Sequence, residues 1–381
     1  MIAGGRGGSL VSNIDGLATP AVLIDRARAE RNLDRMQAAA DARGVRLRPH
    51  TKTHKSPIVA GWQIARGAIG ICCAKLGEAE VFAAHGVADI RLPYPLNPAN
   101  AERVIALLDR TRLSFIVDHP VVARQWSDAM VRAGRRVEIL VKIDVGFHRC
   151  GLDPDSRDTV AAIREIAAFP GLEFRGLLSH AGQAYHAHSE DRLRLMAEAE
   201  VRTMSDLASW CRAKGLAVDE ISLGATPPSR FSLQHEGFTE FRPGNYVYFD
   251  RTQVALGAAT LDDCALTVLA RVVSKPVADR LVLDSGSKTL TNDGARGFAA
   301  APGYGIILRD GRPDDTLLIE RLSEEHATVK VTTGSTTLEP GDLVRIVPNH
   351  SCVVSNLVDQ AWLVDGDTVE PLPIAARGRI T

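Results

Sequence analysis

Short apolar runs alternate with longer amphipathic segments from about Val45 to Asp250. The longer segments, such as Leu76–His85 and Ser189–Lys214, carry apolar residues at helical spacing. Strands that alternate with helices in this way predict parallel βαβ units. Eight strands over about 200 residues indicate an α/β fold of the (β/α)8 TIM-barrel type, although a doubly wound sheet gives a similar alternation. The eight expected strands are Val45–Arg48, Ile69–Cys73, Asp89–Leu92, Leu113–Val117, Val137–Ile143, Glu173–Ser179, Glu220–Leu223 and about Thr239–Arg242.

The pattern changes after about Gln253, where few helical segments remain and Gly, Asp and Pro turns separate β-like stretches. These stretches are Cys264–Val273, Arg280–Asp284, Leu317–Leu322, Thr328–Thr332, Leu343–Val347 and Gln360–Val364. We therefore expect a barrel over residues 26–255, followed by a mostly β domain over residues 256–381. Residues 1–25 form an N-terminal segment that we expect to pack on the β domain.

Composition narrows the function. The chain has 381 residues with 45% hydrophobic and 24% charged residues, and its formal net charge is −1. This balance gives no electrostatic reason to expect nucleic acid or an anionic membrane surface as a partner. No run approaches 18 apolar residues, and Met1–Leu10 has no apolar core of a signal peptide. Six cysteines, two of them adjacent, do not form a disulfide framework, so we expect a cytoplasmic protein that acts on a small molecule.

Polar residues follow five of the predicted barrel strands. Lys52 follows the first strand, Arg149 the fifth and His180 the sixth, while Gly224–Thr226 and Gly244–Asn245 follow the last two. In a (β/α)8 barrel, functional residues lie at the carboxyl ends of the strands, which meet at one rim. The arrangement predicts an active site at that rim.

Lys52 lies in a tight stretch after Pro49 rather than on a solvated helix face. Burying a lysine disfavours its charged form, and Schiff-base formation needs a neutral amine. Lys52 is therefore a candidate to carry a carbonyl cofactor, the alternative being that it is a surface lysine. If that cofactor is pyridoxal phosphate (PLP), a guanidinium at Arg149 that faces the pyridine nitrogen would keep this nitrogen unprotonated. The alternative for Arg149 is a salt bridge at the rim.

The last two strand ends resemble the phosphate site that is common in this architecture. Backbone N–H groups at Gly224 and Gly244, together with the Thr226 hydroxyl, could hold a dianion. Each glycine alone is more simply explained by a turn, but two at neighbouring strand ends favour a phosphate.

His350 and Cys352 are a possible metal pair in the β domain. Residues at i and i+2 lie on one side of an extended strand, and both side chains can bind zinc. A His-x-Cys pair is also common in ordinary packing. Further donor side chains in the same domain, which could equally cap turns, are Asp284, Glu324, Glu325 and His326.

Six motifs in one order along the chain resemble the D-threonine aldolase and D-serine dehydratase group of fold-type III PLP enzymes. They are Arg48-Pro-His-Thr-Lys-Thr-His-Lys55, Gly70-Ile-Cys-Cys-Ala-Lys-Leu-Gly-Glu-Ala79, Asp144-Val-Gly-Phe-His-Arg-Cys-Gly151, Arg242-Pro-Gly-Asn-Tyr246, Ser323-Glu-Glu-His326 and Pro348-Asn-His-Ser-Cys352. This resemblance implies an alanine racemase-like barrel with a C-terminal β domain, and a homodimer.

The resemblance also implies roles for individual residues. Lys52 matches the Schiff-base lysine, Arg149 the arginine that faces the pyridine, and His350 and Cys352 the metal pair. His186 matches a histidine that we assign to proton transfer. The predicted catalytic residues are thus Lys52, His180 and His186. The predicted cofactor-binding residues are Lys52, Arg149, His180, Gly224, Ala225, Thr226, Gly244, Asn245 and Tyr246.

Two positions bear on which bond is broken. Aldolases of this group commonly have His-x-Asp as metal pair and use Mn²⁺ or Mg²⁺, whereas the His-x-Cys found here resembles the dehydratases and favours Zn²⁺. His180 stands where the aldolases have a tyrosine. Against these two positions, the stretch from Gln253 to Asp263 and the segment Asn356-Leu357 resemble D-threonine aldolase-like chains. We therefore expect a PLP- and metal-dependent lyase of β-hydroxy-D-amino acids, with a D-threonine aldolase ahead of a D-serine or D-threo-3-hydroxyaspartate dehydratase. An amino-acid racemase and a non-catalytic PLP carrier are further alternatives.

Overall fold

The computed structural model describes residues 13–381, which form two compact units. The barrel unit comprises residues 33–52, 59–246 and 378–381, and the β unit comprises residues 13–32, 53–58 and 247–377. Met1–Leu10, over which no signal peptide is expected, and the first half of the predicted N-terminal segment lie outside the described residues. Among the described helices, none has the length and apolar character that crossing a membrane requires.

The barrel unit contains an eight-stranded parallel sheet, and each of the eight predicted runs overlaps one strand. In spatial order these strands are β2 (Arg46–Leu47), β9 (Glu240–Phe241), β8 (Glu220–Leu223), β7 (Leu172–Leu178), β6 (Val137–Lys142), β5 (Arg112–Val117), β4 (Asp89–Pro95) and β3 (Ile71–Cys72). The sheet closes on itself because the N–H of Cys72 donates to Pro49 O at 2.7 Å and that of Ile69 to Leu47 O at 2.9 Å. The barrel prediction is confirmed.

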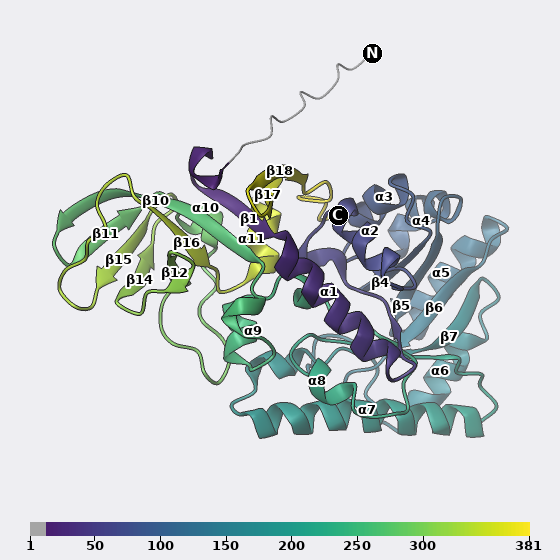
Figure 1. Ribbon diagram of the computed structural model, residues 1–381. Helices are drawn as coiled ribbons and strands as arrows, with labels where there is room; N and C mark the ends of the chain where they lie inside the picture. The colour runs from purple at the N-terminus through teal and green to yellow at the C-terminus, as the bar shows by residue number, and fades with distance from the viewer. Residues whose placement is uncertain (1–12) are drawn as a thin grey trace, which may run out of the picture. The chain divides into compact units, whose positions relative to one another are not determined.

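Helices separate consecutive strands, as the alternating pattern predicts. They are α1 (Arg26–Asp41), α2 (Pro57–Ala65), α3 (Leu76–Ala84), α4 (Ala101–Leu108), α5 (Pro120–Arg132), α6 (Thr159–Ala167), α7 (Glu190–Ala213) and the short α8 (Ser229–Ser232). Figure 1 shows α3 to α7 along the outside of β4 to β7. The start of α7 is fixed by Ser189, whose side chain accepts a hydrogen bond from the N–H of Arg192.

The β unit is built on a mixed sheet in the order β13-β12-β16-β10-β1-β17-β18, and β10 continues into a second layer with β11, β15 and β14. The strand β1 (Ala21–Asp25) lies between β10 and β17 although it precedes the barrel in the chain. The other strands are β10 (Leu266–Val277), β11 (Arg280–Leu283), β12 (Ile306–Arg309), β13 (Arg312–Pro313), β14 (Leu317–Leu322), β15 (Ala327–Val331), β16 (Leu343–Val347), β17 (Gln360–Asp365) and β18 (Thr368–Pro373). Three short helices complete the unit, α9 (Arg251–Ala255), α10 (Ser287–Leu290) and α11 (Ser351–Leu357). The mostly β domain is confirmed.

The extended strand predicted for His350 and Cys352 is wrong. The strand β16 ends at Val347, His350 is the N-cap of α11, and Cys352 lies in the first turn of that helix. The helix begins here because Asp250 Oδ2 accepts the N–H of Ser351 at 2.9 Å, which gives a partner to a backbone donor that a helix start leaves open.

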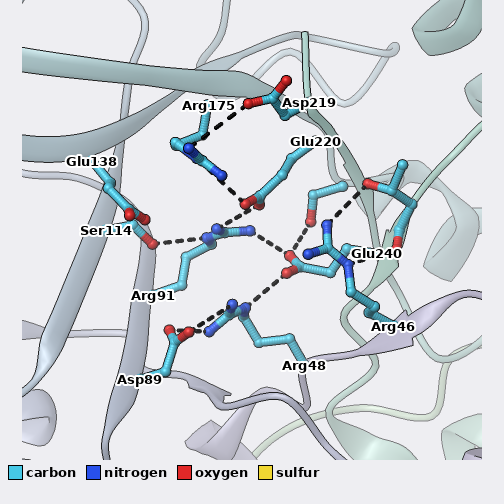
Figure 2. Close-up of polar contacts among 12 residues, drawn as sticks. Arg46, Arg48, Asp89, Arg91, Ser114, Glu138, Arg175, Asp219, Glu220 and Glu240 are labelled. Carbon is cyan, nitrogen blue, oxygen red and sulfur yellow. Dashed lines mark hydrogen bonds and ion pairs between the residues drawn. The ribbon is translucent and has the colours of Figure 1, made fainter.

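A network of charged side chains fills one layer of the barrel interior (Figure 2). Glu240 is fully buried and accepts bonds from Arg91 Nη1 at 2.5 Å and Arg48 Nε at 2.8 Å. The second Nη of Arg91 donates to Glu220 at 2.7 Å. Barrel interiors are usually packed with Val, Ile and Leu and exclude water. The charged side chains here must therefore supply one another with the hydrogen bonds that water would otherwise provide.

Candidate active site

A cavity with about 530 Å³ of empty volume lies at the carboxyl ends of the barrel strands. Most of the residues that line it end a strand or follow one within five residues, which is the position predicted for functional groups. The lining residues are His50, Lys52, Pro93, Lys142, Arg149, Leu178, His180, Tyr185, Ala225, Thr226, Arg242, Gly244 and Asn245. Seven of the predicted site residues are therefore brought together: Lys52, Arg149, His180, Ala225, Thr226, Gly244 and Asn245.

Lys52 lies in a single 3-10 turn, Thr51–Thr53, directly after the segment that closes the barrel. The turn is held by a bond from the N–H of Lys52 to Nδ1 of His50 at 3.2 Å, and by the Thr51 hydroxyl, which donates to Cys72 O at 2.9 Å. Lys52 is half-buried and lines the cavity. The backbone thus presents this amine from a fixed position, as an attachment point for a carbonyl cofactor requires.

His180 presents a neutral imidazole to the cavity. Burial, with Lys52 and Arg149 nearby, lowers the pKa of His180 well below its usual value. Nδ1 lies 2.7 Å from the carbonyl oxygen of Gly224, which can only accept, so Nδ1 carries the proton. Nε2 is left as a hydrogen-bond acceptor among the cations that line the cavity.

The two glycine segments meet at the end of β8 and β9. A side chain at Gly224 would place its Cβ 2.8 Å from Arg242 O, so these strand ends pack this closely only with glycine. The N–H of Gly244 donates to the Thr226 hydroxyl at 3.3 Å. The prediction that the N–H groups of Gly224 and Gly244 are both open to a phosphate is therefore wrong for Gly244, whose N–H already has an acceptor. The Thr226 hydroxyl still has a proton that it can donate to a phosphate.

Four cationic side chains line the cavity, and none of its lining residues, all in the described part of the chain, is a carboxylate. These cations are Lys52, Lys142, Arg149 and Arg242. A site with this charge suits a ligand that carries several negative charges, such as the phosphate and phenolate of PLP together with the carboxylate of an amino acid. The residues present therefore fit PLP.

Lys142 is a residue that the sequence reasoning missed. It ends β6, is 4% exposed, and its Nζ donates to Ile143 O at 2.6 Å. Burial lowers the pKa of Lys142 to about 8, and the charges of Arg242 and Arg149 act in the same direction. The signal was present in the sequence, because a lysine inside the apolar run Val137–Ile143 is unusual for a buried strand.

Replacing Lys142 with methionine should stabilise the cofactor-free protein. The unfolded chain, with a pKa near 10.5, binds more protons than the folded protein, with a pKa of about 8, so wild-type stability rises with pH across that window. At about pH 7 the full penalty is present, and Lys142→Met should raise the free energy of unfolding by up to about 3 kcal/mol. Urea denaturation at about pH 7 and about pH 10 measures this, and a gain that does not shrink at the higher pH would contradict it.

Arg242, also missed as a site residue, connects the cavity to the charged layer of the barrel. It directly follows β9, two residues after Glu240, and its guanidinium donates to the Ser222 hydroxyl and to Ser179 O. The Ser222 hydroxyl in turn donates to Glu240. The buried ion network therefore fixes a cation that lines the cavity.

Three of the predicted catalytic and cofactor-binding residues do not line the cavity. Gly224 lies behind it as the acceptor for His180. Tyr246 is buried, and its hydroxyl accepts a bond from Gln63 at 3.1 Å, which gives it a packing role in the barrel unit. His186 is exposed in the 3-10 turn Gly182–His186, whereas Tyr185 beside it lines the cavity. Tyr185 is thus a candidate that the sequence reasoning missed.

In the β unit, His350 and Cys352 do lie together, joined by a side-chain hydrogen bond. The Sγ of Cys352 lies 3.1 Å from the Thr53 hydroxyl, and His350 Nδ1 lies 2.5 Å from Asp293 Oδ2. Burial opposes a charge on His350, but Cys352, Asp250 and Asp293 together raise the pKa of His350 to about 9. Negative neighbours and an imidazole–thiol donor pair fit a divalent cation.

The other suggested donors are not brought to this pair. Glu324 and Glu325 both pair with Lys288 at exposed positions, and Asp284 accepts from Thr19. Among residues 13–381, no group of three His, Cys, Asp or Glu side chains is arranged to hold a metal. A metal at His350 and Cys352 would complete its coordination with water or substrate, as open catalytic sites do.

The chain is similar to several known proteins. Residues 24–252 match the family of the alanine racemase N-terminal domain, and residues 265–364 match a serine dehydratase domain. A D-threonine aldolase from Arthrobacter sp. is 34% identical over 94% of this chain and 93% of its own. A D-threo-3-hydroxyaspartate dehydratase from Delftia sp. strain HT23 is 35% identical over 88% of this chain and 91% of its own. The solved structure of that dehydratase has a TM-score of 0.89, with 95% of this chain and 98% of the other covered, and a mutant of it was solved in a metal-free form.

Proposed function

Because the chain belongs to the alanine racemase-like family that contains D-threonine aldolases and D-serine dehydratases, we propose that it is a PLP- and metal-dependent lyase of β-hydroxy-D-amino acids, and first of all a D-threonine aldolase. The observation that carries the proposal is the cavity at the barrel rim, where Lys52 and the neutral His180 face three further cations. The proposed substrate is a small molecule, and neither nucleic acid nor a membrane is a proposed partner.

In this proposal, Lys52 is the attachment point of PLP and His180 Nε2 accepts a hydrogen bond from the bound ligands. Thr226, Ala225, Gly244 and Asn245 would hold the phosphate. When bound, PLP supplies an electron sink for the electron pair released at the substrate α-carbon. Arg149, whose guanidinium lies over the Phe147 ring at 5.1 Å from its centre, and Arg242 keep the cavity positive, and this orients the substrate carboxylate.

His350 and Cys352 would hold the divalent metal. When bound, the metal supplies a Lewis acid for the β-hydroxyl of the substrate. Within the β unit, the Cys352 thiol and the Thr53 hydroxyl share a hydrogen bond, which positions the thiol. The metal-free form described for the dehydratase relative supports a metal in this family.

The aldolase reaction needs a group that accepts the β-hydroxyl proton while the Cα–Cβ bond breaks. His186 is the predicted residue, and Tyr185, which lines the cavity, is the neighbouring candidate. The α-carbon is then protonated, and D-threonine gives glycine and acetaldehyde. Mn²⁺ or Mg²⁺ would be the metal of this reaction.

Cys352 favours a second function, a D-serine or D-threo-3-hydroxyaspartate dehydratase. A thiol ligand suits Zn²⁺ better than Mn²⁺ or Mg²⁺. In this reaction Lys52 removes the α-proton, the β-hydroxyl leaves, and the products are a keto acid and ammonia. The relatives at 34% and 35% identity represent both reactions.

Product analysis distinguishes these functions. Purified protein is supplied with PLP, D-threonine and each of Mn²⁺, Mg²⁺ and Zn²⁺ in turn. Acetaldehyde with glycine supports the aldolase, and 2-oxobutanoate with ammonia supports the dehydratase. The appearance of L-threonine or its epimer would make the protein a racemase. A PLP spectrum without turnover of any β-hydroxy-D-amino acid would overturn the lyase proposal and favour a PLP carrier.

Replacing Cys352 with aspartate should move the metal preference from Zn²⁺ towards Mn²⁺, because a carboxylate oxygen is a harder ligand than a thiolate sulfur. Activity of the holoenzyme over a titration of each metal measures the preference. A control is Cys211→Ser, which alters a buried cysteine of α7 in the barrel unit. Unchanged Zn²⁺ dependence in Cys352→Asp would mean that Cys352 is not a ligand.

The homodimer and the cytoplasmic location stay predictions from the sequence. The same holds for the roles of Arg149 and His186, which rest on the resemblance to the family.

A further inference from the structure

Asp293 contacts one of the two ring nitrogens of His350. Its Oδ2 lies 2.5 Å from Nδ1 of His350, and both side chains are about 30% exposed. We infer that Asp293 is a positioning residue for the metal, which acts by holding the His350 ring in the orientation and tautomer that expose Nε2. This inference rests on the metal pair of the proposed function.

The chemistry of the imidazole decides the tautomer. A ring that binds a metal is neutral and has one N–H, and a carboxylate can only accept, so with a metal bound the proton lies on Nδ1 where Asp293 receives it. Nε2 then keeps the lone pair that binds a metal ion. A carboxylate that accepts from a metal-binding histidine also makes the opposite nitrogen a better ligand.

Asp293 cannot act mainly as a third ligand while it makes this bond, because its carboxylate lies at Nδ1. This agrees with the absence of a three-donor cluster within residues 13–381. Asp293 therefore acts through His350.

Hydrogen bonds fix the backbone around Asp293. The N–H of Asp293 donates to the Thr291 hydroxyl at 3.1 Å, and its carbonyl accepts from Asn349 Nδ2 at 2.9 Å. Thr291 is a β-branched residue at φ +68°, a conformation that such residues rarely adopt unless the surroundings impose it. The turn that carries the carboxylate is thus specified by contacts on both sides.

Asn349, which precedes His350, ties this turn to the rest of the β unit. It is 1% exposed, and the same Nδ2 donates to Gly303 O at 3.0 Å while its Oδ1 accepts from Arg251 Nη1 at 3.2 Å. Arg251 also donates to the carbonyls of Ala301 and Pro302. The same hydrogen-bond network therefore holds Asp293 and Asn349, the residue before His350. This network fixes the backbone on both sides of the Asp293–His350 bond.

Calorimetric titration of metal-stripped, PLP-bound enzyme with Co²⁺ tests the inference without relying on turnover. Asp293→Ala should weaken Co²⁺ binding by roughly 10- to 100-fold, the usual effect of losing an outer partner of a metal ligand. Asp293→Asn, which keeps an acceptor oxygen and the volume of the side chain, should lose less. Asp310→Asn removes an exposed carboxylate from a turn of the same unit and should bind as wild type does.

Cys352→Ala removes a proposed metal ligand, whereas the Asp293 variants remove a proposed positioning group. Comparing them distinguishes failure of the metal pair from failure of the role of Asp293. If Cys352→Ala loses Co²⁺ binding while Asp293→Ala and Asp293→Asn bind as wild type, Asp293 has no positioning role. If Cys352→Ala itself binds as wild type, the metal pair of the proposed function is wrong. Equal PLP absorbance in all variants shows that the barrel cavity is intact, and the graded loss from Asn to Ala at position 293 supports the inference.

Discussion

Lys52→Ala should lose the visible absorbance of enzyme-bound PLP and lower turnover by roughly 10³-fold or more, because in the proposed function this amine attaches the cofactor. Borohydride reduction of the wild-type holoenzyme, followed by peptide mass analysis, should find the PLP label on Lys52. Lys214→Ala removes an exposed lysine at the end of α7 and serves as the control, with spectrum and turnover unchanged.

A label on another lysine would contradict the assignment. Lys142 is the informative alternative, because it lines the same cavity and its lowered pKa of about 8 makes its amine partly neutral in ordinary buffers. If Lys142 carries the label and Lys52→Ala keeps its absorbance, Lys142 is the attachment point and Lys52 a neighbouring cation.

Glu240→Gln should reduce the free energy of unfolding by roughly 3–5 kcal/mol, the usual effect of removing one partner from a buried ion pair. Burial raises the pKa of Glu240, but Arg91, Arg48 and Arg242 lower it far more, so the carboxylate is charged at every ordinary pH. Its loss leaves Arg48 and Arg91 with less compensation in the barrel interior. Urea denaturation of the cofactor-free protein measures the change.

Glu165→Gln is the matched control, since Glu165 pairs with Arg124 at the surface and both side chains are about half exposed. That substitution should change the free energy of unfolding by less than about 1 kcal/mol. Equal effects at Glu165 and Glu240 would mean that the buried network contributes no more than a surface pair.

The barrel was predictable from the sequence because its strands are buried on both faces and appear as continuous apolar runs. The charged residues inside it, Arg91 and Glu240, interrupt those runs without moving a strand, since they satisfy one another across the barrel. The strand β1 is also an apolar run, Ala21–Ile24, but its place in the sheet was not predictable. Its partner β10 lies about 245 residues later in the chain, and nothing local indicates that pairing.

The barrel fold made some of the site residues predictable from the sequence, but not all of them. Strand ends locate Lys52, His180 and Thr226, because a barrel brings those ends together. The conformation at Cys352 depends on Asp250, which lies 101 residues from Ser351, so spacing alone gave the wrong element. Which of Tyr185 and His186 faces the cavity depends on the twist of one 3-10 turn, and adjacent residues in a sequence do not reveal it.

The cluster of four cations around the cavity also determines how the protein should be handled. With the cofactor removed, Lys52, Lys142, Arg149 and Arg242 face one another without a compensating carboxylate among the lining residues. This environment should attract small dianions from a buffer as it attracts the phosphate of PLP. Phosphate and sulfate buffers will therefore occupy the cavity and slow cofactor reloading, so reconstitution is best carried out in a buffer without multivalent anions.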